Sequence, residues 1–336
     1  MKQSKWGVVV PTIREEQFKE FLKSFGEMFE KHKVTLYVVE DHPTKQIKIP
    51  KQKFEVKHYS HKEIEADLKE DAWIIPKQSG SCRSYGFLKA YQAGHEFVLT
   101  LDDDTRKLSV DLITQYEIDF IPKMENSGYH RVDKLVEGIP MNVRMRGYPW
   151  LDRHTKPIMA QYGMWTDVPD LDAVTTLLTG TLEPTEVRGY FEVVPKYCAL
   201  TGCIMNAAFR REVIPCMYQL LMGEEYGVDR FDDIWSALFL KKICDVKGWN
   251  VAINGYACVQ HTRASDAQRN LKMESGGLID NEYLWEKLLQ DRFQRTDSIK
   301  LMYEHTAETL FYLLPNYSNT NKLSEAMQTW IKKIYQ

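Results

Sequence analysis

Three consecutive carboxylates, Asp102, Asp103 and Asp104, follow a run at 97–101 in which four of five residues are apolar. Such a run predicts a buried strand, and in open α/β sheets ligands bind beyond the carboxyl ends of the strands. Carboxylate oxygens suit Mg²⁺ or Mn²⁺, and these ions usually share their coordination with substrate phosphates. The triplet therefore predicts a site for a divalent cation and a diphosphate. An acidic turn, in which Asp is also common, is the alternative.

Polar side chains also follow two earlier predicted strands. The run Trp6–Val10 is apolar and leads to Thr12 and Arg14, and the run at 34–39 leads to Asp41. A helical pattern of apolar residues lies between the two runs, and this β-α-β order is typical of a nucleotide-binding unit. Thr12, Arg14 and Asp41 are therefore candidate nucleotide contacts, although Asp41 alone also fits an ordinary turn.

A Gly- and Ser-rich stretch, Ser79–Gly86, opens a helix predicted to run to about Ala93. Backbone N–H groups at a helix start can bind an anion, and Arg83 adds a fork of donors for a phosphate or a uracil oxygen. A surface arginine paired with a carboxylate is the alternative. Three short elements are expected before this stretch, an edge strand, a helix and a strand, at 51–59, 60–69 and 71–75.

Arginines and aromatic residues gather in the middle of the chain, where Arg146 and Arg153 flank Tyr148 and Trp150. Diphosphates pair with arginine and sugars stack on aromatic faces, although a surface loop has the same composition. A strand is expected just before this group, at 139–143. The next stretch, 162–172, is predicted as a loop suited to a sugar, with Trp165 and Asp170 as candidate contacts.

The last candidates come from two later elements. Asp232 and Asp233 open a helix predicted to run to about Lys247, where they could contact sugar hydroxyls or act as a simple N-cap. Another helix is expected before it, at about 210–222. His261 follows a strand predicted at 249–256, and it could complete the metal shell begun by Asp104. An isolated structural histidine is the alternative.

The overall composition narrows the class of protein. The chain has 336 residues with a net charge of −3, which gives no reason to expect nucleic acid as a partner. No apolar run is long enough to cross a bilayer, and the first residues lack the apolar core of a signal peptide. We therefore expect a cytoplasmic protein with reduced cysteines, since its six cysteines are scattered without a CxxC pair.

Taken together, these motifs resemble the reversibly glycosylated polypeptide family, whose plant members include UDP-arabinopyranose mutases. The resemblance covers about residues 6 to 275. The matching segments follow the family order: Val10–Arg14, Cys82-Arg83 with Gly86, Asp102–Asp104, Arg146–Pro149 with Arg153, Gly163–Trp165 with Val168–Ala173, Gly202 with Met205-Asn206, Arg230–Trp235, and His261 with Ala264-Ser265 and Asn270–Lys272.

The resemblance implies an α/β fold of the GT-A type, which is Rossmann-like, over residues 1–275. Its nucleotide part would span about 1–107 and its sugar or acceptor part about 108–275. Beyond the resemblance, apolar residues at helical spacing predict a helical extension at 276–336, which offers a surface for packing or for a homo-oligomer.

The resemblance also implies the ligands and the reaction. The substrate would be a UDP-sugar, with UDP-arabinose expected, and the cofactor Mn²⁺ or Mg²⁺. The chain would then be a UDP-sugar mutase that interconverts pyranose and furanose forms. The alternatives are a transferase that passes the sugar to a separate acceptor and a non-catalytic UDP-sugar-binding subunit.

The family pattern assigns roles to two arginines, and the candidate residues collected above suggest the other roles. By motif, Arg146 is the arginine that becomes reversibly glycosylated, and Arg153 is a second required arginine. The metal ligands would be Asp104 and His261 with help from Asp102, and a proton acceptor would come from Asp232, Asp233 or Asp170. The contacts to the UDP-sugar would come from Thr12, Arg14, Asp41, Arg83, Asp102, Asp103, Trp165 and Asp170. Departures from the pattern, such as Tyr162 in place of His and Thr262-Arg263 in place of Ser-Lys, leave the exact sugar open.

Overall fold

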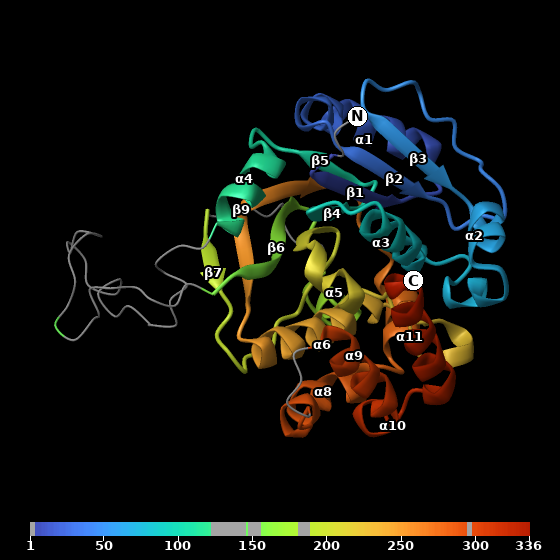
Figure 1. The fold of residues 1–336 in the computed structure, drawn as a ribbon, viewed down its shortest axis with the longest axis vertical. Helices are drawn as coiled ribbons and strands as arrows, with labels where there is room; N and C mark the ends of the chain where they lie inside the picture. The colour runs from blue at the N-terminus through green and yellow to red at the C-terminus, as the bar shows by residue number, and fades with distance from the viewer. Residues whose placement is uncertain (1–3, 122–145, 147–155, 181–188, 294–297) are drawn as a thin grey trace.

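The computed structural model describes residues 4–121, 146, 156–180, 189–293 and 298–336. Within these ranges the strands form one mixed sheet flanked by helices (Figure 1). Its first half is parallel, in the order β3-β2-β1-β4. These strands are Trp6–Pro11 (β1), Thr35–Val39 (β2), Glu55–Tyr59 (β3) and Phe97–Leu101 (β4).

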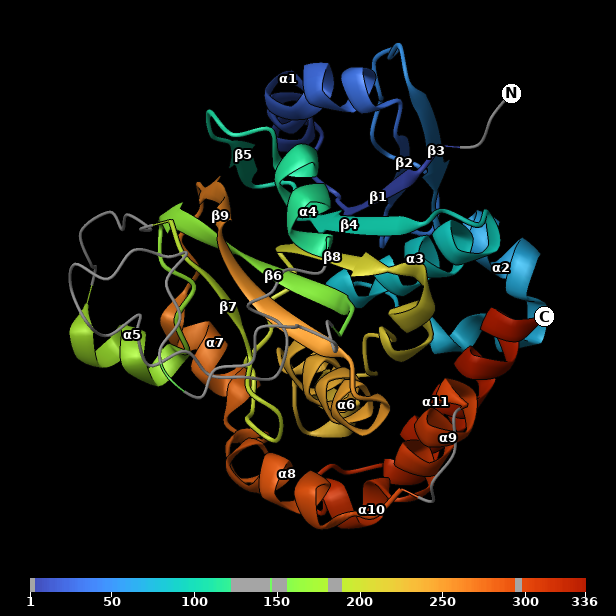
Figure 2. The same cartoon turned by 60° about the vertical axis from the view of Figure 1, so that its left-hand side comes forward.

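The second half of the sheet is mixed. Asn206–Arg210 (β8) pairs antiparallel with β4 and with Ile158–Asp167 (β6). Asn250–His261 (β9) pairs parallel with β6 and antiparallel with both Thr105–Lys107 (β5) and Phe191–Val193 (β7). Figure 2 shows β6 and β9 running obliquely below β4 and β8, so the sheet is strongly curled.

Helices cover both faces because the central strands are apolar on both sides. Val8 and Val10 of β1 face one core, which is shared with Glu15–His32 (α1) and Leu112–Phe120 (α4). Val9 faces the other core, which is shared with Arg83–Gln92 (α3) and Asp232–Lys247 (α6). The smaller helices are His61–Leu68 (α2), Ala173–Thr179 (α5) and Ala267–Glu274 (α7).

The C-terminal helices belong to the same core as α3 and α6. They are Leu278–Gln290 (α8), Ile299–Glu308 (α9), Leu310–Leu313 (α10) and Thr320–Tyr335 (α11). Trp330 of α11 stacks on Tyr218 with ring centroids 5.4 Å apart, and its Nε1 donates to the Pro215 carbonyl at 2.9 Å. The buried face of α11 therefore packs against the rest of the chain. In the part of the chain that is described, no helix is both long and apolar enough to span a membrane.

The expected α/β class with a helical C-terminal extension is confirmed, but three local predictions are wrong. The strand expected at 71–75 is part of the 3₁₀ segment Lys69–Ile74. In place of the helix expected at 210–222, strand β8 ends at Arg210, the 3₁₀ segment Arg211–Cys216 follows, and 217–222 has no regular secondary structure. The loop expected at 162–172 begins as strand β6, because pairing with β8 and β9 on both sides satisfies its backbone. The strand expected at 139–143 lies outside the described residues.

The pairing of β6 with β9 shifts register between Gly163 and Met164, and this irregularity sets the course of the end of β9. Gly163 permits the close approach, since a Cβ there would lie 2.4 Å from the Ala257 carbonyl oxygen. Asn206 on β8 holds both strands, because its Nδ2 donates to the carbonyls of Met164 at 3.1 Å and Ala257 at 2.8 Å. β9 therefore continues to His261, beyond the end predicted at 256.

Candidate functional site

A cavity of about 440 Å³ lies beyond the carboxyl ends of β4 and β9. It gathers side chains from the start of α3, the end of β4, the loop after β6, the start of α6 and the end of β9. The predicted site residues that line it are Arg83, Asp102, Asp104, Asp170, Asp232, Asp233 and His261. Predicted site residues up to 178 positions apart in the sequence therefore meet at one place, since Arg83 and His261 both line it.

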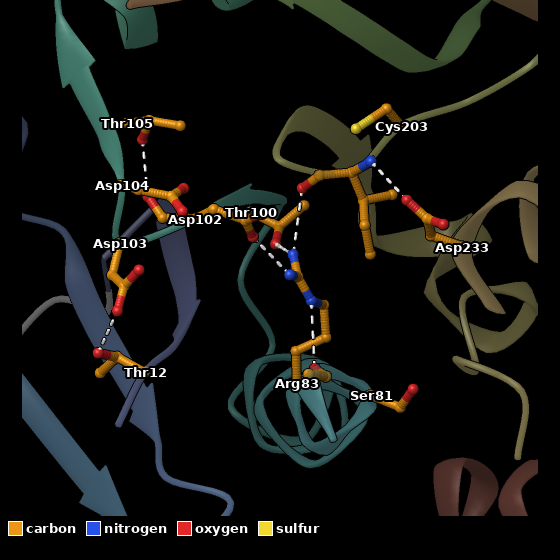
Figure 3. Close-up of polar contacts among 12 residues, drawn as sticks. Thr12, Ser81, Arg83, Thr100, Asp102, Asp103, Asp104, Thr105, Cys203 and Asp233 are labelled. Carbon is orange, nitrogen blue, oxygen red and sulfur yellow. Dashed lines mark hydrogen bonds and ion pairs between the residues drawn. The ribbon is translucent and has the colours of Figure 1, made fainter. Parts of the chain in front are cut away.

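Arg83 is a buried, fully engaged residue of this cavity. Figure 3 shows its guanidinium pointing from α3 toward Asp102 and Thr100. One terminal nitrogen donates to Thr100 Oγ1 at 3.0 Å and to the Ile204 carbonyl at 3.2 Å, and the other pairs with Asp102 Oδ1 at 2.5 Å. Arg83 thus pairs with a carboxylate, as in the alternative interpretation, but inside the site rather than on the surface. It fixes the position of Asp102.

Asp104 and His261 form an arrangement suited to a cation. Asp104 is 4% exposed, and its Oδ1 has no hydrogen-bond partner among the described residues. This oxygen lies 3.9 Å from His261 Nε2. His261 Nδ1 lies 2.9 Å from the Val168 carbonyl and donates to it, which directs the Nε2 lone pair toward Asp104.

A buried carboxylate oxygen facing an imidazole lone pair is costly unless a cation lies between them, so this donor pair fits the expected divalent metal. The full shell of three protein ligands is not assembled, since no group of three metal-binding side chains is found in the described ranges. Asp102 also lines the cavity, and its Oδ1 pairs with Arg83. The protein would therefore supply Asp104 and His261, and substrate oxygens or water would fill the other positions.

The middle carboxylate of the triplet turns away from the cavity. Figure 3 shows Asp103 pointing toward Thr12. Asp103 Oδ2 accepts from Thr12 Oγ1 at 2.6 Å and from Arg14 Nε at 3.2 Å, and Oδ1 accepts from a terminal nitrogen of Arg14. Burial raises the pKa of Asp103 despite these partners. Thr12, Arg14 and Asp103 form one cluster beside the cavity and do not line it.

Two adjacent carboxylates occupy the first turn of α6. Asp232 accepts from Ser81 Oγ at 2.7 Å, while Asp233 accepts from the Ile204 backbone N–H at 3.2 Å. Asp232 is the first helical residue, and the N-cap is Phe231. Burial, together with the neighbouring charge of Asp232, raises the pKa of Asp233 to about 7. The pair therefore holds a proton near neutral pH and can exchange it.

The other predicted residues differ in their relation to the cavity. Asp170 lines it and accepts from the Cys203 thiol at 3.2 Å. Asp41 and Trp165 are not lining residues, and burial raises the pKa of Asp41. Arg146 is an exposed turn residue and is also not among the lining residues. Arg153 lies outside the described residues.

Arg230 and Glu274, neither of which was predicted as a site residue, link the walls of the cavity. Glu274 is 5% exposed. Its Oε1 accepts from Arg230 Nε at 2.9 Å, and its Oε2 accepts from the Ala173 backbone N–H at 2.8 Å. Arg230 adopts a left-handed φ of 68°, which a non-glycine residue rarely adopts. No sequence signal marks this clamp, because its members lie 44 and 101 positions apart.

Replacing Glu274 with Gln is expected to lower the free energy of unfolding by about 1–3 kcal/mol, because an amide cannot accept both bonds and leaves a buried donor unpaired. The measurement is urea denaturation. The matched control is Glu282→Gln, an exposed position on α8, which should change stability by less than about 0.5 kcal/mol. Equal loss in both variants would contradict the proposed clamp.

Comparison with known proteins shows the family to which this chain belongs. The family described as "Reversibly glycosylated polypeptide" matches residues 1–336. "Probable UDP-arabinopyranose mutase 1" of Pisum sativum is 29% identical, over 97% of this chain and 89% of its own. "UDP-arabinopyranose mutase 1" of Arabidopsis thaliana is 29% identical, over 97% and 90%. "UDP-arabinopyranose mutase 3" of Arabidopsis thaliana is 30% identical, over 84% and 77%. Because the family match extends over the whole chain, the protein belongs to the reversibly glycosylated polypeptide family, as its motifs predicted.

Proposed function

We propose that this chain is a UDP-sugar mutase that converts UDP-arabinopyranose into UDP-arabinofuranose. Its family and the names of its relatives support the substrate class. The single structural observation that carries the proposal is the cavity that is lined both by Asp104 and His261, which face each other, and by the Asp232–Asp233 pair.

The excess of acidic residues in the cavity supports a sugar and a cation as its ligands rather than a polyanion without a cation. Carboxylates accept hydrogen bonds from sugar hydroxyls, and their excess charge favours a metal ion. The acidic lining residues are Asp102, Asp104, Asp170, Asp172, Asp229, Asp232, Asp233 and Glu274. The arginines in the described lining are Arg83, Arg230 and Arg263.

Asp104 and His261 would hold Mn²⁺ or Mg²⁺, and the bound ion would neutralise the charge that develops on the UDP leaving group. The protein's own part is to fix these ligands. Arg83 holds Asp102 at the carboxyl end of β4, and the Val168 carbonyl orients His261. The cluster of Thr12, Arg14 and Asp103 supports the same strand end from the other side.

The sugar is proposed to pass through Arg146. The bond between the anomeric carbon and the phosphate oxygen breaks, UDP leaves with the electron pair, and a guanidinium nitrogen bonds to that carbon and loses a proton. A protonated guanidinium is a poor nucleophile, so the Asp232–Asp233 pair, or Asp170, takes this proton. Arg146 must reach the cavity for this step, since it is not one of the lining residues.

While the sugar is bound to the guanidinium nitrogen, the bond between the anomeric carbon and the ring oxygen breaks and that oxygen gains a proton. A different hydroxyl oxygen then bonds to the anomeric carbon and loses its proton. The reverse of the first transfer returns the sugar to UDP and the proton to the guanidinium. Arg153 is proposed as the second required arginine on the family motif alone.

Purified protein incubated with UDP-arabinopyranose and Mn²⁺, without an acceptor, is expected to form UDP-arabinofuranose, and chromatography measures the product. Arg146→Ala should abolish both this conversion and labelling of the protein by radioactive UDP-sugar, because the acceptor nitrogen is lost.

The matched control is Arg269→Ala, an exposed arginine on α7 outside the cavity, which should keep both signals. Product that forms only when a separate glycan or protein is added would identify a transferase instead. Binding of UDP-sugar without turnover would identify a non-catalytic subunit.

A further inference from the structure

The three arginines in the described lining of the cavity are held in different ways. Arg83 is buried and engaged with Asp102, Thr100 and a backbone carbonyl. Arg230 is clamped by the buried Glu274. The Arg263 side chain is 58% exposed, and its polar contact within the described ranges is a single one, from Nε to Asp104 Oδ2 at 3.0 Å. Arg263 is therefore the cavity arginine whose guanidinium is held least firmly.

The backbone next to Arg263 is nevertheless anchored. The N–H of Thr262 donates to the Asp104 carbonyl at 3.0 Å, and Thr262 Oγ1 donates to the same carbonyl at 2.7 Å. The base of the Arg263 side chain is thus fixed beside the cation-binding carboxylate. Only its guanidinium can change partner, and it remains within one side-chain length of Asp104.

The two oxygens of Asp104 have separate surroundings. Oδ1 is unpaired and faces His261 Nε2, whereas Oδ2 accepts from Arg263 and lies 3.5 Å from a terminal nitrogen of Arg14. A dication on Oδ1 would bring like charges together on one carboxylate, and Arg14 keeps its bidentate partner Asp103. The repulsion therefore acts mainly on the exposed Arg263, whose surface ion pair is weak.

We propose that Arg263 binds the diphosphate of the nucleotide. When the cation and the nucleotide enter together, the Arg263 guanidinium leaves Asp104 and pairs with the diphosphate. This inference rests on the proposed function, and it adds a residue to the same site. In the nucleotide-free state Arg263 partly neutralises Asp104. With the nucleotide present, the N–H groups of its guanidinium donate to diphosphate oxygens. A planar guanidinium can bind two of these oxygens at once and therefore matches them better than the ammonium group of a lysine does.

The test compares the binding of UDP and of uridine, each with saturating Mn²⁺, by calorimetry, together with binding of Mn²⁺ alone by electron paramagnetic resonance. In Arg263→Gln the affinity for UDP is expected to fall by about tenfold or more, since a charge-assisted bond is lost. Affinity for uridine should stay the same, and affinity for Mn²⁺ alone should stay the same or increase. Arg263→Lys should recover part of the UDP affinity.

Arg269→Gln is the matched control, because it removes the same charge from an exposed position outside the cavity. Unchanged UDP affinity in Arg263→Gln would overturn the inference, and so would an equal loss of uridine affinity or a loss of Mn²⁺ affinity. If the unmodified protein fails to bind UDP with Mn²⁺, the proposed function fails as well. If it binds UDP and only the variant comparison is negative, the role of Arg263 alone is wrong.

Discussion

Asp104→Asn is expected to lower kcat/KM by roughly 1000-fold, which corresponds to the loss of several kcal/mol of metal assistance. Asp104 supplies the one buried carboxylate oxygen that faces His261 without a hydrogen-bond partner in the described part of the chain. An amide at this position is a much weaker cation ligand. Mn²⁺ is expected to raise the Tm of the unmodified protein, and this rise should be absent in the variant.

The same variant should fold normally without metal. The unpaired, buried Oδ1 of Asp104 costs free energy, whereas the ion pair of Oδ2 with the exposed Arg263 contributes little. The neutral amide should therefore leave the metal-free Tm unchanged or raise it. Asp103→Asn is the matched control within the triplet, because Asp103 faces Thr12 and Arg14 rather than the cavity. It should keep the Mn²⁺-dependent shift but lower the metal-free Tm. A Mn²⁺ response retained in Asp104→Asn would refute the assignment of this ligand.

Turnover by the unmodified protein is expected to rise with pH and to level off above about pH 7. The reason is that the Asp232–Asp233 pair must lose its proton to act as the base, and burial raises the pKa of Asp233 to about 7. Removing a general base costs about 10²–10⁴-fold in rate, so Asp233→Asn should lower kcat by that factor and abolish the inflection. The measurement is a pH–rate profile between pH 5.5 and 8.5.

The Asp232–Asp233 pair should also affect how the free energy of unfolding changes with pH. The expected change is opposite in sign to that caused by an ordinary ion-paired carboxylate. The folded-state pKa of Asp233 lies above its unfolded value, so the native state binds more protons between about pH 4 and 7. Stability should therefore fall as the pH rises through this window, and Asp233→Asn should remove that fall. Urea denaturation at pH 5 and pH 8 measures this fall in stability.

If Asp170→Asn rather than Asp233→Asn removes the inflection of the pH–rate profile, Asp170 is the base.

The sequence by itself determined the parallel half of the sheet and the helix α1, which packs on one face of it. β1, β2 and β4 were predictable because each is a short, continuous apolar run, and α1 because its apolar residues recur at helical spacing. The family was also determined at this level, since ordered motifs survive where overall identity is near 29%. Local patterns failed at β6 and β8, whose strand structure depends on partners distant in the chain.

Only the tertiary structure decided which of the collected residues share a cavity. The triplet reads as three equivalent acids, yet Asp102 pairs with Arg83, Asp103 holds Thr12 and Arg14, and Asp104 alone faces His261. The clamp by Glu274 and the contact of Arg263 with Asp104 left no local pattern either. The physical reason is that apolar periodicity records burial within one element, whereas the partner of a polar side chain is set by how distant elements pack.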